Sequence, residues 1–598
     1  MSLNLLEYDN VFLENQIYKA VMVKLISHIY EVMRVTASMI LLFMLLSCQL
    51  KNTKDNFWWP SQSSPAGIVT SLKGSTHGQN ALAYSLAGLV AQAQKQGELD
   101  ELIWHESEGE YDVWYEKFIQ RTGAEERGEY DVWSLLARYN YLVKGYILYN
   151  PVLDSASSSK LDFSYNIATS FAGIEQAVII TPEMEPILQE LGYKLILDAR
   201  NIPEEEFLDK MKVHAGKNII FTMHPSFHNN RDLAIANKAI VTYGMNEITI
   251  KSMALINPIS PVVGWNQGSE DDFTLLPTTH GLFNTASDWC DNLLVLSSDA
   301  LHSQIKKIKS LDPQTIDFDD GKHFHSFILS DGDNMQWSIG SFIKNESYWG
   351  NQIHGEFPVG FTSCPVNLSM MAPDVLDEMV KTQPSGTTII EYGGGYYYPD
   401  FYADVFGDEK KEVLRAFAKK INFNMQRTGA KVFGFICIDL NSTQAMEAYQ
   451  IFAEEIKELV GMYAVQYAPY HGGHGKIFWV KNKKGTNIPV VTAQYSLWQG
   501  LDFEGGGDID KIAGYINTSI RNTEETMGWT IVHAWSKFEN PIKPGHYESG
   551  IGPIKWCINQ LSDDIRIVSP EELLWRIRMK EHPEETMLIF EEKNKFIN

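Results

Sequence analysis

Short apolar runs, each ending in polar residues or glycine, recur through the C-terminal half of the chain. Most of them are followed by a stretch in which apolar residues repeat with the spacing of an amphipathic helix. Eight such strand–helix units within about 275 residues match the usual size of a (β/α)8 barrel. We therefore predict a (β/α)8-like barrel, with a doubly wound open sheet as the competing fold. The predicted strands are 323–330, 356–362, 387–392, 431–438, 463–468, 488–495, 529–535 and 565–568.

The best-defined helix of this series follows the last predicted strand. Ser569 stands where an N-cap residue is expected, Pro570 follows at the first helical position, and Glu572 completes a capping box. Leu573 and Leu574 then begin the apolar face. These signals predict a helix that starts at Pro570.

The pattern between residues 66 and 312 is mixed. The run 80–95 has helical periodicity, whereas 145–149, 177–181 and 218–222 have the composition of short buried strands. This alternation predicts about three small parallel-sheet units, so the fold class is α/β with several small domains ahead of the barrel. The predicted domains are 66–145, 146–215 and 216–312, followed by the barrel domain 313–598.

Residues 35–47 form an apolar stretch that follows Arg34. This stretch is too short for a bilayer-spanning helix, which needs about 20 residues, but it suits the hydrophobic region of a signal peptide. It ends in Leu-Leu-Ser-Cys, with Cys48 where a lipobox has its acylated cysteine. We predict a signal peptide over 1–48, a tether over 49–65, and export to the bacterial cell envelope on a lipid anchor at Cys48. A secretory signal with a coincidental cysteine is the alternative.

The net charge of −25 and the pI near 5.1 exclude one class of partner. An acidic surface repels phosphate backbones, and the sequence has no basic stripe, so nucleic acid is not an expected partner. Aromatic residues make up 12 % of the chain. Rings that are not used in the core offer flat faces, and sugars present matching apolar faces. The composition therefore favours a carbohydrate ligand.

Carboxylates follow several of the predicted strands, at the end of the barrel where active sites lie. The first strand ends in Asp331-Gly332-Asp333-Asn334, and an extended chain would place both aspartates on one face. Two close carboxylates can share a proton or bind a cation. Glu391 ends the third strand and Asp439 follows the fourth. A simple turn is the alternative for the first string, because Asp-Gly and Asp-Asn are common turn formers.

A glycine-tyrosine string runs from Gly393 to Pro399 as Gly-Gly-Gly-Tyr-Tyr-Tyr-Pro. Glycine permits positive φ and a close approach of ligand to backbone, and tyrosine offers a stacking face with a hydroxyl group. Other strand ends add amides, rings and a histidine. The predicted substrate-binding residues are Asn334, Gly395, Tyr396, Tyr398, Gln466, Gln494, His533, Trp535 and Trp265. One wall of the cleft could also include Glu270, Asp288 and Trp289, for which core or loop packing is the favoured interpretation.

The string Gly393–Pro399 fits the signature GxGYxYP, and the chain thereby resembles the family of glycoside hydrolase-like proteins named after that signature. The strings Asp331–Asn334 and Val263–Trp265 are also similar to those of this family, so the resemblance covers nearly the whole mature chain. It implies a Bacteroidota-type lipoprotein with several small N-terminal domains ahead of the named C-terminal domain. It also implies activity on glycosides, although the signature itself assigns no catalytic residue.

Glycoside hydrolysis needs a proton-donating carboxyl group and a second carboxylate, about 5–5.5 Å apart for retention or about 6.5–9.5 Å for inversion. Asp331, Asp333, Glu391 and Asp439 supply the carboxylates. We predict Asp439 as the acid or base, with Asp331 or Asp333 as its partner, in an enzyme that hydrolyses a poly- or oligosaccharide. The alternatives are a metal-assisted carbohydrate esterase or deacetylase and a non-catalytic glycan-binding lipoprotein.

The histidine and cysteine patterns do not predict a metal centre. His323 and His325 stand at the beginning of a strand, which is the wrong end of a barrel for an active site. His471 and His474 lie on a predicted loop with no helix to fix their spacing, and the sequence has no CxxC pair. We expect no metal, no cofactor, a carbohydrate ligand and membrane contact through the lipid anchor alone. The oligomeric state stays open.

Overall fold

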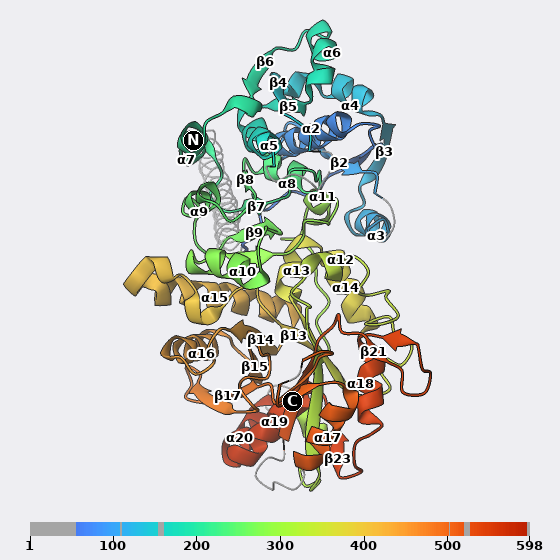
Figure 1. Cartoon of the computed structure of the whole chain (residues 1–598), viewed down its shortest axis with the longest axis vertical. Coiled ribbons are helices and arrows are strands. Elements are labelled where there is room, and N and C mark those ends of the chain that lie inside the picture. Colours follow the sequence, from blue (N-terminus) through green and yellow to red (C-terminus); the bar gives the residue numbers. More distant parts are fainter. Residues whose placement is uncertain (1–55, 108–110, 153–160, 502, 520–526, 595–598) are drawn as a thin grey trace, which may run out of the picture. The chain divides into compact units, whose positions relative to one another are not determined.

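The computed structural model describes residues 56–107, 111–152, 161–501, 503–519 and 527–594 (Figure 1). The predicted signal peptide with Cys48, and residues 49–55 of the predicted tether, lie outside the described residues. Within the described ranges, no helix combines the length and the apolar character that crossing a membrane requires. The fold is mixed α/β.

The first of three small parallel sheets in the N-terminal half has the strand order β2-β1-β3 (Figure 1). β1 and β2 are almost entirely buried, and each has an apolar centre, Ile68-Val69 in β1 and Leu102-Ile103-Trp104 in β2. Helix α2 packs against this sheet; its N-cap Thr76 accepts a hydrogen bond from Gln79 N, and Gly97 ends it in the left-handed conformation. The elements are β1 (Gly67–Ser71), α2 (His77–Gln96), β2 (Glu101–His105), α3 (Val113–Thr122), β3 (Glu125–Tyr130) and α4 (Val132–Arg138).

The second and third sheets are also parallel, with the orders β5-β4-β6 and β10-β9-β7-β8. The second sheet contains β4 (Gly145–Leu148), β5 (Ala177–Ile180) and β6 (Leu195–Asp198), with helices α5 (Ser164–Glu175), α6 (Glu185–Glu190) and α7 (Glu204–His214). The third contains β7 (Ile220–Thr222), β8 (Ile240–Thr242), β9 (Pro261–Gly264) and β10 (Phe283–Thr285), with helices α8 (Arg231–Ala236), α9 (Glu247–Met253), α10 (Glu270–Thr279) and α11 (Leu293–Leu296).

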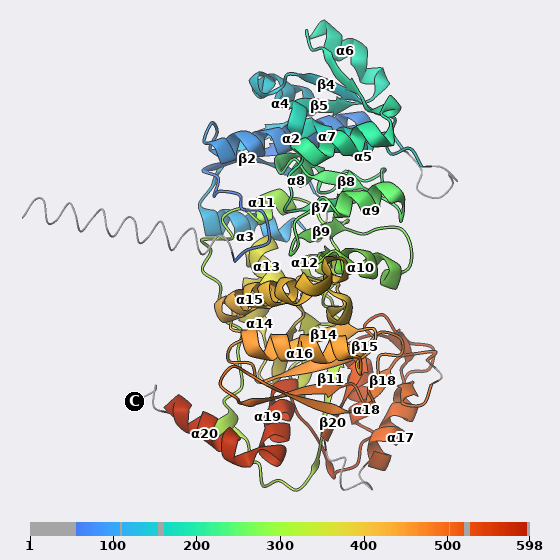
Figure 2. The same cartoon turned by 90° about the vertical axis from the view of Figure 1, so that its left-hand side faces the viewer.

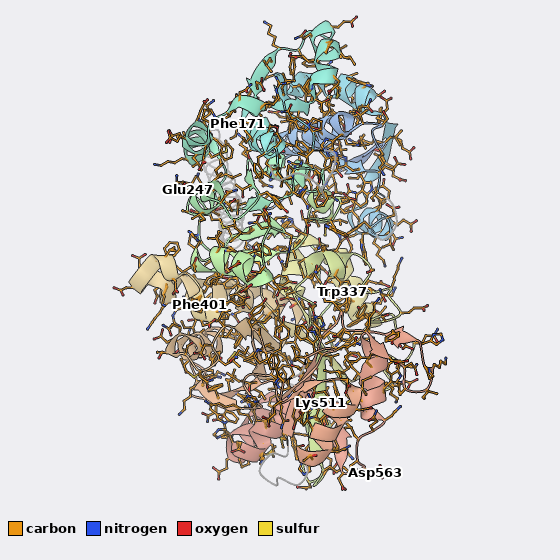
Figure 3. The ribbon with its side chains drawn as sticks, in the orientation of Figure 1. Phe171, Glu247, Trp337, Phe401, Lys511 and Asp563 are labelled. Carbon is orange, nitrogen blue, oxygen red and sulfur yellow. The ribbon has the colours of Figure 1, made fainter. Side chains whose placement is uncertain are left out.

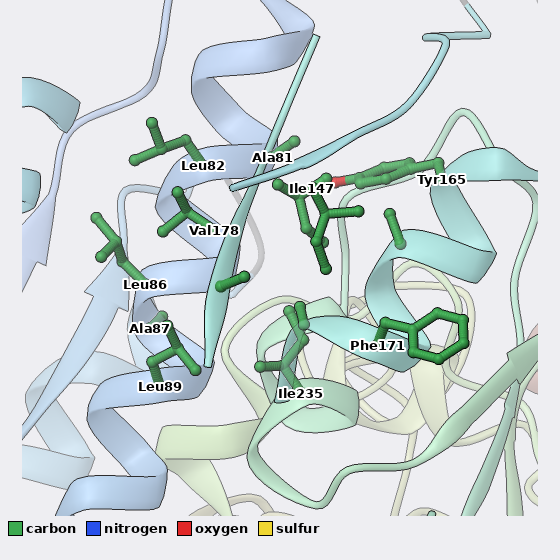
Figure 4. Close-up of a cluster of buried hydrophobic side chains, with 14 of the residues drawn as sticks. Ala81, Leu82, Leu86, Ala87, Leu89, Ile147, Tyr165, Phe171, Val178 and Ile235 are labelled. Atoms are coloured by element: carbon green, nitrogen blue, oxygen red, sulfur yellow. The ribbon is translucent and has the colours of Figure 1, made fainter. Parts of the chain in front are cut away.

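One continuous apolar core joins these three sheets. Figure 4 shows part of it, where Leu86 and Leu89 of α2 lie beside Val178 of β5, with Ile235 of α8 and Phe171 of α5 close by. Each sheet is too small to bury a core of its own, so the three stabilise one another by sharing apolar surface.

The C-terminal half contains one large sheet with the order β16-β17-β15-β14-β13-β12-β11-β20-β18-β19, and β23 pairs with the beginning of β11. Figure 2 shows α15 and α16, which pack against each other over this sheet. The strands are β11 (His323–Leu329), β12 (Val359–Ser363), β13 (Thr387–Glu391), β14 (Val432–Cys437), β15 (Gly461–Gln466), β16 (Ile477–Lys481), β17 (Asn487–Thr492), β18 (Tyr495–Leu497), β19 (Gly506–Gly507), β20 (Met527–Val532) and β23 (Ile565–Ile567), with a separate hairpin of β21 (Phe538–Glu539) and β22 (Tyr547–Glu548). The helices are α12 (Met335–Ile339), α13 (Pro365–Met371), α14 (Pro373–Thr382), α15 (Lys410–Thr428), α16 (Thr443–Glu455), α17 (Ile509–Ser519), α18 (Ile551–Ile558), α19 (Pro570–Glu581) and α20 (Pro583–Asn594).

All eight predicted C-terminal runs contain strands, with 488–495 divided between β17 and β18, but a closed (β/α)8 barrel is not confirmed. The sheet is a curled half-barrel. The run 477–481, which was not predicted, forms β16 and pairs antiparallel with β17, so it occupies the edge at which a closed barrel would continue. At the other edge β18 and β19 are only short strands. Ser569 caps the last large helix as predicted, because its side chain accepts a hydrogen bond from Glu572 N in α19.

The third small sheet is joined to the C-terminal sheet through the glycine-tyrosine string. Asn284 of β10 and Tyr396 exchange two backbone hydrogen bonds, each with an N···O distance of 2.9 Å. The Asn367 side chain adds a bond to Gly394 O, at 2.8 Å, and accepts one from Trp58 Nε1, at 3.0 Å. These bonds hold the beginning of α10 beside the carboxyl ends of β11 and β13.

Candidate active site

The loop after β11 places two aspartates at the carboxyl end of the central strand. Asp331 takes the left-handed backbone conformation, with φ of 67°, so the chain turns sharply as soon as the strand ends. Gly332 N donates to Thr362 Oγ1 of β12, at 2.9 Å, which ties this turn to the neighbouring strand. Asn334 caps the short helix α12 by accepting a bond from Trp337 N. The chain therefore turns at Asp331 instead of staying extended, as the alternative interpretation had it, and this turn presents Asp331 and Asp333.

A narrow cavity of about 20 Å³ lies against these aspartates. This volume has room for about one water molecule. A neighbouring cavity of about 10 Å³ shares Glu270, Asp333, Tyr392, Tyr396 and Ile436 with it and extends to Gly395 and Tyr398. The larger cavity is lined by Glu270, Ser330, Asp331, Asp333, Thr362, Tyr392, Tyr396, Ile436, Tyr470 and Ile531.

Three carboxyl groups meet at the cavity, and two of them have strongly perturbed acidity. Burial, together with the carboxylates of Asp331 and Asp271, raises the pKa of Glu270 to about 7. Burial also raises the pKa of Asp333 well above its usual range, and the negative charges of Asp331 and Glu270 add to this effect. Three negative charges so close to one another are mutually unfavourable, so the site holds at least one proton near neutral pH.

Asp331 differs from the other two because hydrogen-bond donors converge on it. The Ser330 hydroxyl donates to Asp331 Oδ2, and Trp535 Nε1 donates to Asp331 Oδ1 at 3.0 Å. These two bonds fix the orientation of the Asp331 side chain at the cavity. The site thus combines one side chain held by two donors with two carboxyl groups whose pKa is raised.

Phenol groups form much of the remaining wall. Burial raises the pKa of Tyr392, Tyr396 and Tyr470 well above the usual range, so each hydroxyl keeps its proton and can donate it in a hydrogen bond. Trp265, which follows β9, packs edge-on against Tyr396 with 5.3 Å between ring centroids. The predicted role of Trp265 in the site wall is therefore a supporting one through Tyr396.

Gly395 lets the glycine-tyrosine string pass close to β10. Its φ of 129° lies where side-chain-bearing residues are strained, and a Cβ atom there would come within 2.1 Å of Asn284 O. Tyr396, Tyr397 and Tyr398 all line the smaller cavity, and Tyr397 also packs against Phe417.

Two predicted catalytic carboxylates lie elsewhere. Glu391 is fully buried and accepts hydrogen bonds from Val366 N, at 2.7 Å, and Gly393 N, at 2.6 Å. Its side chain therefore has a structural role, because it connects the beginning of α13 to the start of the glycine-tyrosine string. Asp439 is exposed and accepts a bond from Asn441 N, which is the geometry of a turn before α16. Neither is among the residues that line the cavity described above.

The remaining predicted binding residues divide into two groups. Trp535 is 44 % exposed, and His533 stacks on Trp498 with 3.9 Å between ring centroids, so both lie around Asp331. The Gln466 amide lies against Gly472, and the Gln494 amide lies against Gly528 at the beginning of β20, away from the carboxyl ends of the strands. The predicted strand 488–495 is in fact interrupted before Gln494, since β17 ends at Thr492.

Glu270, Tyr392 and Tyr470 were not among the predicted site residues, although Glu270 was considered for the wall. The sequence signal that could have indicated Glu270 is the preceding Ser269. This residue is the N-cap of α10, where its side chain accepts a hydrogen bond from Asp272 N. Such an N-terminus is a common position for functional carboxylates, but it also occurs in purely structural helices.

No group of three or more histidine, cysteine, aspartate and glutamate side chains within the described ranges has a geometry suited to a metal ion. The three carboxyl groups at the cavity, two of them with raised pKa values, form a cluster that shares at least one proton. All four cysteines in the described part of the chain are buried and free.

Comparison with known proteins relates three segments of the chain to family models. Residues 321–578 match a model described as "GxGYxYP putative glycoside hydrolase C-terminal domain", residues 143–210 match "GxGYxYP_N second domain", and residues 217–298 match "GxGYxYP third domain". No curated protein matches the chain. A crystal structure described as a putative hydrolase from Bacteroides thetaiotaomicron VPI-5482 is similar over 88 % of this chain and 97 % of that one, with 19 % identity and a TM-score of 0.71. At this identity the similarity shows a shared fold.

Proposed function

This chain belongs to the GxGYxYP family, and on that premise we propose that it is a glycoside hydrolase that cleaves a poly- or oligosaccharide with paired carboxyl groups. The family and the similar structure support a hydrolase in general terms. The observation that carries the specific proposal is the convergence of Glu270, Asp331 and Asp333 on one cavity. Glu270 and Asp333 have raised pKa values, and a carboxyl group that keeps a proton beside a second carboxyl group is what acid–base cleavage of a glycosidic bond requires.

We assign the proton donor to Glu270. Its pKa of about 7 lies close to a neutral working pH, where a general acid combines sufficient protonation with sufficient acidity. Glu270 also stands at the beginning of α10 and is only partly buried, so it can reach the oxygen of a leaving group at the cavity entrance. Asp333 is more deeply buried and serves as the neighbour that shares the cluster's proton.

Asp331 is the partner carboxylate. It would either attack the anomeric carbon or remove a proton from the water that does so, while Glu270 protonates the departing oxygen. The cavity has the volume of a water molecule and is too small for a sugar ring. The ring would therefore lie outside the cavity, against the exposed face of Trp535.

The proposal predicts that the purified mature chain releases reducing sugar from at least one member of a broad glycan panel. Chromatography of the products, with reducing-end and acetate assays on the same samples, distinguishes the alternatives. Release of acetate without shorter glycans would indicate a deacetylase, and metal analysis of the protein would then be the next measurement. Binding of sugars without any product would indicate a glycan-binding protein and would overturn the enzymatic proposal.

The pKa of Glu270 also predicts a pH profile. A general acid must be protonated in the free enzyme, and the protonated fraction of Glu270 decreases as the pH rises through about 7. We expect kcat/KM to fall by about tenfold per pH unit above that point. Initial rates at low substrate concentration from about pH 5 to about pH 8, where proteins tend to be most stable, measure the beginning of this limb. A profile that stays flat to the alkaline end would contradict the assignment.

A further inference from the structure

A second and much larger groove lies in the C-terminal half. Its volume is about 750 Å³, which falls within the range of about 300–1,000 Å³ that is typical of ligand sites. Its walls come from the segment after β18, from the beginning of α17 and from the β21–β22 hairpin. Residues that line it include Gln499, Leu501, Asp508, Lys511, Phe538 and Pro544.

The groove and the acidic cavity share one loop, which follows β20. In this loop Trp535 donates to Asp331, whereas Ser536 accepts a hydrogen bond from Gln499 N at 3.1 Å. The His533 ring bonds to the Ser536 hydroxyl, at 2.9 Å, and stacks on Trp498. Trp535 beside Asp331 and Gln499 in the groove wall are therefore connected through a single residue, Ser536.

The walls of the groove are fixed by bonds that do not involve a ligand. Asp508 Oδ1 accepts a bond from Lys511 N, at 3.0 Å, and so caps the beginning of α17. The buried His471 ring bonds to Ser496 Oγ and Glu504 O, which fastens the chain on either side of the segment. The groove is thus preformed, and binding in it requires little ordering of the protein.

The chemistry of the lining fits a neutral sugar chain. Gln499, Asp508 and Lys511 offer donors and acceptors, whereas Leu501, Phe538 and Pro544 offer apolar surface, and a pyranose presents both hydroxyls and a C–H face. The groove is lined by three carboxylates but by only one ammonium group, that of Lys511; the carboxylates are those of Asp508, Asp510 and Glu539. This surplus of negative charge disfavours uronic acids. Figure 3 labels Lys511 among the C-terminal elements.

We propose that this groove is a secondary saccharide-binding site for the distal units of the same neutral oligosaccharide whose reactive bond lies at the acidic cavity. The inference rests on the proposed function for the identity of the ligand, but it concerns binding and not cleavage. It implies that the protein prefers long chains over short ones.

The test measures binding by calorimetry in an Asp331→Asn background, so that no ligand is consumed. The probes are the disaccharides and hexasaccharides of the neutral β-1,4-linked glucose, xylose, mannose and N-acetylglucosamine series, with a galacturonic acid hexamer. The groove variants are Gln499→Ala with Lys511→Gln, which removes polar contacts, and Pro544→Trp, which fills the groove. The matched control is Lys537→Gln, an exposed lysine of the shared loop that does not line the groove.

We expect one neutral hexasaccharide to bind at least about tenfold more tightly than its disaccharide, and this advantage to disappear in both groove variants but not in the control. The galacturonic acid hexamer should gain no such advantage. Equal affinity for short and long chains, or a length advantage that survives in both groove variants, would overturn the inference. Hydrolysis by the chain with Asp331 intact is measured separately, so a failed glycosidase proposal and a failed groove proposal give different results.

Discussion

Replacing Glu270 by glutamine is expected to lower kcat/KM on the natural glycan by about 10³-fold, within the range of about 10²–10⁴ for loss of a general acid. Glutamine keeps the size and polarity of the side chain but has no proton to give to the departing oxygen. The loss should be much smaller for a nitrophenyl glycoside, whose leaving group needs no proton. The alkaline limb of the pH profile should also disappear.

Asp439→Asn is the matched control for this experiment, because Asp439 is also a carboxylate that follows a strand of the same sheet but does not line the cavity. Its activity should stay within about twofold of wild type, as expected for an exposed surface substitution. The reverse outcome, with Asp439→Asn inactive and Glu270→Gln active, would return the catalytic role to the residue that the sequence pattern favoured. Unchanged thermal midpoints in both variants exclude unfolding as the cause.

Gly395→Ala is expected to destabilise the protein by at least about 3 kcal/mol, which is at the upper end of single-substitution effects. A Cβ atom would lie 2.1 Å from Asn284 O, and that contact is with backbone that cannot rotate away. The φ of 129° adds strain of its own. The junction between β10 and the glycine-tyrosine string would have to open, so a partial loss of activity should accompany the loss of stability.

The comparison for this variant is Gly514→Ala in the interior of α17, where a Cβ atom would meet nothing within 4 Å. There alanine should raise the free energy of unfolding by about 0.5–1 kcal/mol. Urea denaturation followed by circular dichroism measures both variants. Equal stabilities for Gly395→Ala and the wild type would show that the string can move away from β10.

The C-terminal strands were predictable because buried parallel strands have no polar face, and their apolar runs are visible without any knowledge of partners. Whether the sheet closes into a barrel could not be predicted in this way. It depends on which strands occupy the edges, and the short run 477–481 becomes an antiparallel edge strand only by pairing with β17. Asp331 and Asp333 could be predicted for a similar local reason, because the end of a strand fixes where its next residues lie.

Glu270 could not be assigned from local pattern. Its importance depends on the two backbone bonds between Asn284 and Tyr396, which bring separate sheets together and cannot be inferred from periodicity. Asp439 was favoured because it follows a strand, but its neighbours make it a turn residue: Asp439 N donates to the Asp400 carboxylate, and Asp439 Oδ1 accepts from Asn441 N. Strand-end position thus indicates where to search, while burial and partners decide the role.

The proposed proton donor and the two aspartates come from different parts of the fold, Glu270 from the third small sheet with its helices and Asp331 and Asp333 from the loop after a strand of the large sheet. The segment 321–578 that matches the named C-terminal domain would keep the motif and both aspartates yet lack the acid. In enzymes, displacement of a catalytic group by about 1 Å can cost about 10²-fold in rate. The backbone pairing between β10 and the glycine-tyrosine string therefore sets the distance between Glu270 and the two aspartates. A substitution that shifts this pairing would change the reaction rate even if it lies far from all three carboxyl groups.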